Sequence, residues 1–193
     1  MHRIVFTGAQ GTGKTTVLDE FKDRGFKVIT EVVRQLSKQG VKINKDGDED
    51  GQAKILDVYK ELLGEVSIAG YISDRCLVDV IAYSMYLAEH GKVSNEFVQE
   101  QKNQLVEFKK SNPDIVYCYY PIEFSVVADG VRDTDEDFRK AIDVNIQKIL
   151  VEAGIQPIIV KGTVEERVAK VQRVVNWLHE GIALFMEDVT NED

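Results

Sequence analysis

The stretch from Gly8 to Thr16, GAQGTGKTT, has residue types and spacing that indicate phosphate chemistry. Its pattern, G-x-x-x-x-G-K-[ST], lets backbone N–H groups turn inward around an anion at the start of a helix. Lys14 can then reach the β- and γ-phosphates of a nucleoside triphosphate, and the Thr15 hydroxyl can bind Mg²⁺. The residues expected to bind the nucleotide are Gly8, Ala9, Gln10, Gly11, Thr12, Gly13, Lys14, Thr15 and Thr16.

Asp74 and Arg75 stand at the end of the apolar stretch that begins at residue 70 and place a carboxylate beside a guanidinium group. In parallel sheets, side chains at the carboxyl ends of strands face the crevice where ligands bind. Asp74 is therefore expected to hold Mg²⁺, or to accept a proton from the phosphoryl acceptor, and Arg75 to bind the acceptor or a phosphate. The alternative is a surface turn with a local ion pair.

Glu31 and Arg34 lie one helical turn apart if a helix starts near Glu31. At the same edge of the sheet, Glu31 would be a general base for an acceptor hydroxyl and Arg34 would orient that acceptor. The alternative is an ordinary i,i+3 ion pair on the surface.

The segment 125–140 is expected to form a lid that brings Arg132 and Arg139 over the phosphates and excludes water. The alternative for both arginines is a charged, solvated helix surface. Gly162, which follows the last apolar stretch, is expected near the nucleotide base, although a simple strand-to-helix turn explains it equally well.

The elements that must position these residues alternate along the chain. Short apolar stretches predict five strands, whereas Phe138, Ile142, Ile146 and Ile149 share one face of a predicted helix at 136–152. Thr163 to Glu166 match a capping box. This alternation predicts an α/β fold with a mostly parallel, doubly wound sheet. The predicted strands are 3–8, 26–30, 70–74, 114–120 and 156–162.

The length of 193 residues is typical of a single domain, expected to cover 1–193. Within it we expect an acceptor-side excursion at 31–69, an acidic loop at 45–51 and an acidic tail at 187–193. The three histidines, His2, His90 and His179, are far apart in the sequence and predict no common site.

The composition favours a cytoplasmic protein without a targeting segment or a membrane span, in which Cys76 and Cys118 are reduced thiols. The net charge of −9 disfavours a nucleic-acid partner without excluding one, because a local basic patch is compatible with it. The sequence leaves open a homodimer.

The phosphate loop, the Glu-x-x-Arg helix start, the strand ending in Asp-Arg and the VADGVR…FR segment together resemble P-loop kinases of small molecules. The closest pattern is that of the ribosylnicotinamide kinase domain of the bifunctional NAD regulator and related AAA-like kinases, and it covers roughly residues 3 to 175. The resemblance implies a P-loop NTPase fold with strand order 2-3-1-4-5, ATP as donor, Mg²⁺ and a lid that carries Arg132. The other parts of the bifunctional protein have no counterpart here, so its regulatory role does not follow.

These observations predict an ATP-dependent kinase that phosphorylates a nucleoside, a nucleotide or a related small metabolite. Lys14 and Arg132 would stabilise developing charge, and Glu31 or Asp74 would accept a proton. If the acceptor is a monophosphate, Arg34 and Arg75 would bind its phosphate and no strong base would be required. The alternatives are a switch NTPase that hydrolyses ATP, and a kinase of a modified base in DNA.

Overall fold

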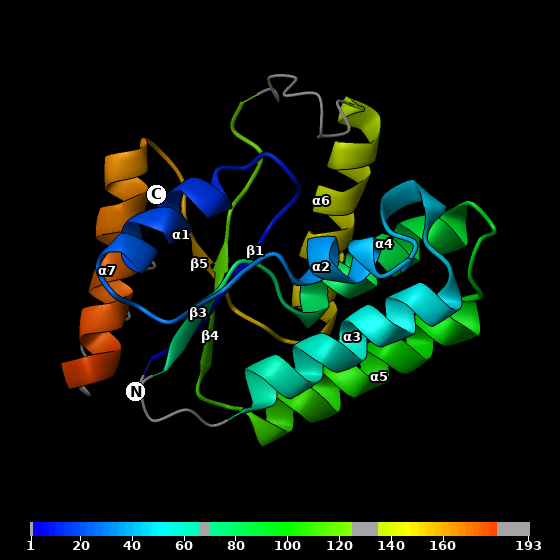
Figure 1. Ribbon diagram of the computed structural model, residues 1–193, viewed down its shortest axis with the longest axis horizontal. Helices are drawn as coiled ribbons and strands as arrows, with labels where there is room; N and C mark the ends of the chain where they lie inside the picture. The colour runs from blue at the N-terminus through cyan, green and yellow to red at the C-terminus, as the bar shows by residue number, and fades with distance from the viewer. Residues whose placement is uncertain (1, 66–69, 125–134, 181–193) are drawn as a thin grey trace.

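The computed structural model describes residues 2–65, 70–124 and 135–180, and these form a parallel sheet with helices on both faces (Figure 1). The strand order is β2-β3-β1-β4-β5, and every pairing is parallel. The α/β fold and the order 2-3-1-4-5 are therefore confirmed. The strands are β1 (Arg3–Thr7), β2 (Val28–Ile29), β3 (Tyr71–Ser73), β4 (Ile115–Tyr119) and β5 (Ile158–Ile159).

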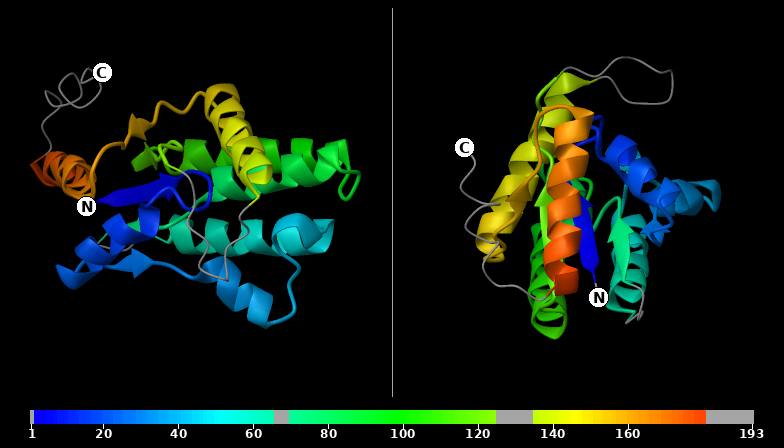
Figure 2. Two further views of the ribbon diagram at one scale, coloured as in Figure 1. Left: turned by 90° about the horizontal axis from the view of Figure 1, so that it is seen from above. Right: turned by 90° about the vertical axis from the view of Figure 1, so that its left-hand side faces the viewer.

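Two groups of helices cover the sheet. α1 and α7 contact each other on one face, whereas α3, α4, α5 and α6 pack together on the other, as Figures 1 and 2 show. No described helix is long and apolar enough to cross a membrane. The described helices are α1 (Lys14–Asp23), α2 (Val32–Lys38), η1 (Asn44–Asp46), α3 (Glu49–Gly64), α4 (Leu77–Glu89), α5 (Asn95–Ser111), α6 (Glu136–Glu152) and α7 (Val164–Glu180).

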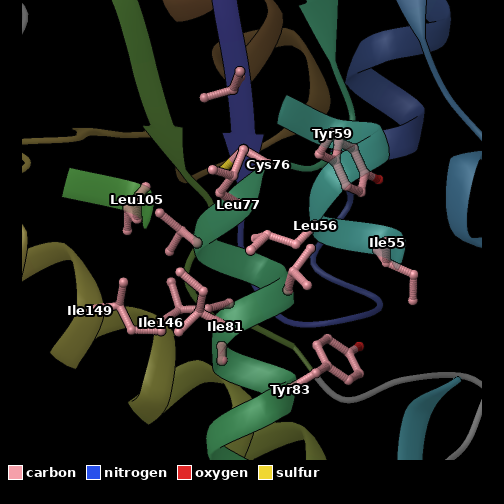
Figure 3. Packing of buried hydrophobic residues seen from close by; sticks show 14 of the residues in the cluster. Ile55, Leu56, Tyr59, Cys76, Leu77, Ile81, Tyr83, Leu105, Ile146 and Ile149 are labelled. Carbon is pink, nitrogen blue, oxygen red and sulfur yellow. The ribbon is translucent and has the colours of Figure 1, made fainter. Parts of the chain in front are cut away.

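The central strand β1 is buried on both faces and divides the core. Ile4 and Phe6 belong to the apolar cluster beneath α1 and α7, whereas Val5 belongs to the larger cluster on the opposite face. Helix α4 runs through that larger cluster, with Leu77 and Ile81 packed among residues of α3, α5 and α6 (Figure 3). Both helix layers therefore fix β1, which leads directly into the phosphate loop.

Local sequence signals account for the helix ends nearest the site. Helix α6 has the predicted bounds, and its predicted apolar face is buried. The capping box before α7 is present, since Thr163 N donates to Glu166 Oε2 at 2.7 Å and Glu166 N donates to Thr163 Oγ1 at 3.3 Å. This capping box fixes the start of α7 at the carboxyl edge of the sheet.

Two predictions are wrong in part. The acidic loop expected at 45–51 contains the start of α3, because Asp48 accepts a hydrogen bond from Gly51 N at 2.9 Å and caps the helix. The histidines are not all isolated, since His2 Nδ1 lies 2.9 Å from His179 Nε2. Residues 125–134 of the predicted lid, with Arg132, and the predicted tail lie outside the described residues.

Candidate active site

An open cavity of about 580 Å³ lies at the carboxyl ends of β1, β2 and β3. Its walls bring together the phosphate loop after β1, the start of α2 after β2 and the turn after β3. The lining residues include Gln10, Gly11, Thr12, Gly13, Lys14, Thr15, Thr16, Glu31, Arg34, Asp74 and Arg75. Eleven residues predicted from the sequence therefore surround one space.

The phosphate loop has a conformation that requires glycine at two positions. Gly13, the residue before α1, has φ of 84°, and Gly8 has φ of 148°. A Cβ atom on Gly8 would also lie 2.5 Å from the carbonyl oxygen of Tyr120. Because side chains are excluded here, the backbone can bend closely enough to bind an anion.

Lys14 is buried and turned back onto its own loop. Its Nζ lies 2.7 Å from the carbonyl oxygens of Gly8 and Ala9, and 3.1 Å from Thr12 Oγ1. Burial, together with the positive charge of Arg75, lowers the pKa of Lys14 to about 8. Its ammonium group is therefore held in place, and it loses its proton more readily than an exposed lysine.

Asp74 has the features expected of a magnesium ligand. Its Oδ1 is buried and has no hydrogen-bond partner among the described residues. Burial raises the pKa of Asp74, although the charges of Lys14 and Arg75 oppose that shift. A carboxylate oxygen left without a donor in a cavity shared with Thr15 fits a hard cation, which is commonly held by one or two protein groups and the substrate phosphates.

Arg75 is paired with Asp79, a residue that the sequence reasoning missed. The Arg75 Nη1 atom lies 3.2 Å from Asp79 Oδ1, and the same oxygen accepts a hydrogen bond from Gly8 N at 3.3 Å. The other oxygen, Oδ2, accepts from Cys76 N at 3.1 Å. Asp79 therefore connects the acceptor side of the cavity with the phosphate loop.

Glu31 and Arg34 line the cavity and also form an ion pair with each other, at 2.8 Å. Glu31 has a left-handed backbone, with φ of 63°, immediately before α2. Such a conformation costs a residue other than glycine about 1–3 kcal/mol and is concentrated at functional sites. The ion pair predicted as the alternative is therefore present. The backbone strain of Glu31 and its position in the cavity wall nevertheless favour a functional role.

A smaller recess of about 60 Å³ extends the cavity between α3 and α4. Tyr59 and Tyr83 belong to both spaces, and Gln52 adds a buried amide to the recess. Aromatic rings beside an amide suit a flat, polar ring system. The predicted excursion at 31–69 supplies most of this wall.

Three further groups, Arg139, Arg167 and Gly162, are not among the residues that line this cavity. Arg139 was predicted to contact substrate, but it is 1% exposed and donates to the carbonyl oxygens of Gln10 and Gly11. Arg167, which the sequence reasoning missed, donates to Thr12 O. Gly162 donates to the Glu123 carboxylate.

The two residues that the sequence analysis did not identify, Asp79 and Arg167, differ in whether a sequence signal marks them. Asp79 follows Arg75 at the i,i+4 spacing of a helix ion pair, so that spacing could have identified it. Arg167 has no such signal, because α7 carries several charged residues and the sequence does not indicate which of them faces the loop.

Comparison with known proteins agrees with this architecture. A profile of the AAA domain family matches residues 3–167. The chain therefore belongs to that family. No curated protein matches the sequence.

Among solved structures, the chain is similar to NadR in complex with NR, with a TM-score of 0.67 and 19% identity. That match covers 92% of this chain and 52% of NadR, so the chain spans about half the length of that protein. Deoxyadenosine kinase from M. mycoides has a TM-score of 0.63 and 16% identity, with coverage of 90% of this chain and 98% of the kinase. Thymidylate kinase from Ehrlichia chaffeensis has a TM-score of 0.54 and 15% identity, with the same coverage of both chains. The chain therefore shares the α/β P-loop NTPase fold of these proteins.

Proposed function

We propose that this protein is a kinase that transfers the γ-phosphoryl group of ATP to a hydroxyl group of a nucleoside or a similar small metabolite. The observation that carries the proposal is the single cavity that joins the phosphate loop to Glu31, Arg34, Asp74 and Arg75. A donor phosphate bound at Lys14 and an acceptor bound at the opposite wall would share this space. The fold shared with nucleoside and nucleotide kinases supports the same reaction class.

The charges on the acceptor side favour a hydroxyl over a phosphate. Arg34 is paired with Glu31, and Arg75 is paired with Asp79. With Asp74, this wall carries three carboxylates against two guanidinium groups. An incoming monophosphate would have to displace these carboxylates or be repelled by them, whereas a neutral hydroxyl compound meets neither cost.

The residues of the chain then have distinct roles. Lys14 and the loop N–H groups would hold the donor phosphates, and Arg34 and Arg75 would orient the acceptor. Asp74 or Glu31 would take the hydroxyl proton. Thr15 and Asp74 would hold Mg²⁺, which neutralises phosphate charge when bound. The role of Arg132 in closing the site stays a prediction.

The test is ATP consumption with Mg²⁺ and a panel of nucleosides, nucleoside monophosphates, ribosylnicotinamide and oligonucleotides, with Lys14→Ala as the blank. The proposal predicts turnover that depends on a nucleoside-like acceptor and disappears in the blank. Steady hydrolysis that is indifferent to every acceptor would contradict it and favour a switch NTPase.

A further inference from the structure

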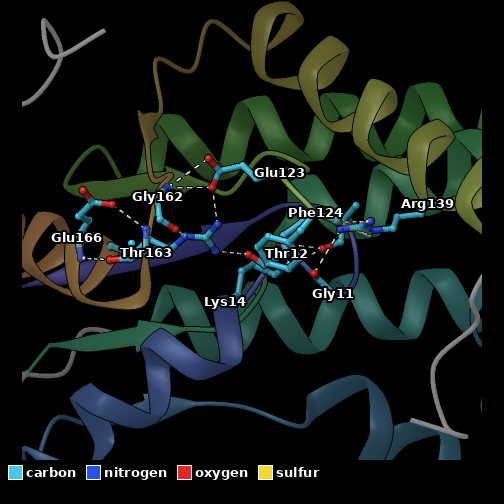
Figure 4. Close-up of polar contacts among 11 residues, drawn as sticks. Gly11, Thr12, Lys14, Glu123, Phe124, Arg139, Gly162, Thr163 and Glu166 are labelled. Atoms are coloured by element: carbon cyan, nitrogen blue, oxygen red, sulfur yellow. Dashed lines mark hydrogen bonds and ion pairs between the residues drawn. The ribbon is translucent and has the colours of Figure 1, made fainter. Parts of the chain in front are cut away.

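Three consecutive carbonyl oxygens of the phosphate loop accept hydrogen bonds from two buried arginines (Figure 4). From α6, Arg139 Nε donates to Gln10 O at 2.8 Å and Nη2 donates to Gly11 O at 3.3 Å. From α7, Arg167 Nη1 donates to Thr12 O at 2.5 Å. The outer side of the loop is therefore held from two helices, α6 and α7, that both lie far from the loop in the sequence.

These contacts determine which way the peptide groups of the loop face. In a trans peptide the C=O and the following N–H point in opposite directions. When the carbonyl groups of residues 10, 11 and 12 face the arginines, the N–H groups of residues 11, 12 and 13 face away from them. An anion-binding loop requires its N–H groups to point toward the anion, and the arginines favour this by holding the carbonyl groups in the opposite direction.

Neither arginine is among the described residues that line the cavity. Arg139 also donates to Phe124 O at 2.8 Å and pairs with Glu136 at 3.3 Å. Arg167 also donates to Gly162 O at 2.8 Å and pairs with Glu123. Their hydrogen bonds go to the loop carbonyl oxygens and to residues that are not among those lining the cavity, so an effect of either arginine on a ligand passes through the loop.

The close approach of Arg167 gives a second reason for glycine at position 13. A Cβ atom there would lie 2.6 Å from Arg167 Nη1. The loop thus excludes a side chain at the place where the guanidinium group reaches Thr12 O. A lysine at position 167 or 139 would keep the charge but lose the planar fork that contacts several acceptors at once.

We infer that Arg139 and Arg167 are positioning residues that hold the phosphate loop in its anion-binding shape, and that neither is a ligand of the acceptor. This inference rests on the nucleotide site proposed above. It assigns Arg139 a role different from the substrate contact predicted from the sequence.

The experiment compares two variants, Arg139→Lys and Arg167→Lys, with a control. The control is Arg24→Lys, the same substitution at an exposed arginine that follows the last residue of α1. Calorimetry measures the Kd for ADP and for inorganic tripolyphosphate, and thermal melting verifies folding. The inference predicts that both Lys variants weaken both ligands by the same factor, about tenfold or more, and that Arg24→Lys changes neither beyond about twofold. Where acceptor turnover is measurable, the acceptor KM stays unchanged.

A further variant keeps the inference testable if Arg139→Lys and Arg167→Lys do not fold. Glu123→Gln removes the carboxylate that holds Arg167 from a position that is 29% exposed. It should weaken ADP and tripolyphosphate equally, by about threefold, because Arg167 loses one of its anchors.

Three results would overturn the inference: folded Lys variants that bind both ligands within about twofold of the unaltered chain, a loss for ADP without a loss for tripolyphosphate, or a raised acceptor KM with unchanged ADP binding. If the unaltered chain binds neither ligand, this inference and the proposed function both fail. If binding depends on the arginines but no phosphoryl transfer occurs, only the proposed function fails.

Discussion

The carboxylate of Asp79 accepts a hydrogen bond from the backbone N–H of Gly8, 3.3 Å away, at the first residue of the phosphate loop. The same carboxylate pairs with Arg75, so one buried group touches both halves of the cavity. A change at Asp79 should therefore affect donor and acceptor binding together.

We expect Asp79→Asn to lower the free energy of unfolding by about 2 kcal/mol, because Arg75 loses its counter-charge in a largely buried setting. The Arg75 side chain is 21% exposed, so solvent reduces the loss relative to a fully buried pair. Urea unfolding measures it, and Arg75→Met in the same background is the control. If the two changes are additive, the pair does not contribute as described.

The left-handed backbone of Glu31 should lower the stability of the protein unless glycine occupies the position. Its φ of 63° suits glycine, so we expect Glu31→Gly to be more stable than Glu31→Ala by about 1 kcal/mol. Both variants lose the ion pair with Arg34, so the difference between their stabilities reports the backbone conformation and not that pair. Chemical denaturation measures the difference, and equal stabilities would argue against backbone strain at this position.

Glu31→Gln separates the role of the base from that of the backbone. If Glu31 accepts the hydroxyl proton, kcat falls by about 10²-fold while the Kd for ADP stays the same. Asp74→Asn is the companion variant. A full rate in Glu31→Gln with a large loss in Asp74→Asn would assign the base to Asp74.

Nucleotide affinity should depend on pH through Lys14. Its pKa of about 8 in the free protein rises when phosphates bind, so binding takes up a proton above that pH. The affinity for ADP should be constant with respect to this group below about pH 7, and should fall by up to about tenfold per unit above about pH 8. Calorimetry in buffers of different ionisation enthalpy measures the proton uptake, and Lys14→Arg should abolish it. An affinity that is constant up to about pH 9.5 would contradict the lowered pKa.

The contact between His2 and His179 predicts sensitivity to acid. Burial and the neighbouring His179 lower the pKa of His2 from its ordinary 6.5, so the folded protein resists protonation there. Stability should fall as pH drops through 6.5, by at most about 1.4 kcal/mol per unit for this group. His179→Gln should reduce that slope, whereas His90→Gln should not. Identical slopes in all three proteins would exclude the coupling.

The sheet and the walls of the cavity could be predicted from the sequence because their signals are local. Ile4 to Phe6 form an apolar strand that leads into the loop, and Thr163 caps its helix through residues three positions away. Strand ends then gather Asp74 and Glu31 at one edge of a parallel sheet.

The remaining features depend on tertiary packing. Arg167 reaches Thr12 across 155 positions, and His2 meets His179 across 177, and no spacing rule covers such distances. The sequence predicts a loop around Asp48 because acidic residues dominate its surroundings, although the same acids favour the first turn of a helix. The position of Arg139 behind the loop follows from the docking of α6, which its own apolar pattern does not specify.

The most direct test of the central claim is ³¹P nuclear magnetic resonance of the product formed from ATP, Mg²⁺ and the acceptor that gives turnover. Transfer to a hydroxyl group predicts a new phosphomonoester signal that grows with ADP and is absent with Lys14→Ala. A new phosphoanhydride signal would show that the acceptor presents a phosphate. Inorganic phosphate as the sole product would contradict phosphoryl transfer to an acceptor altogether.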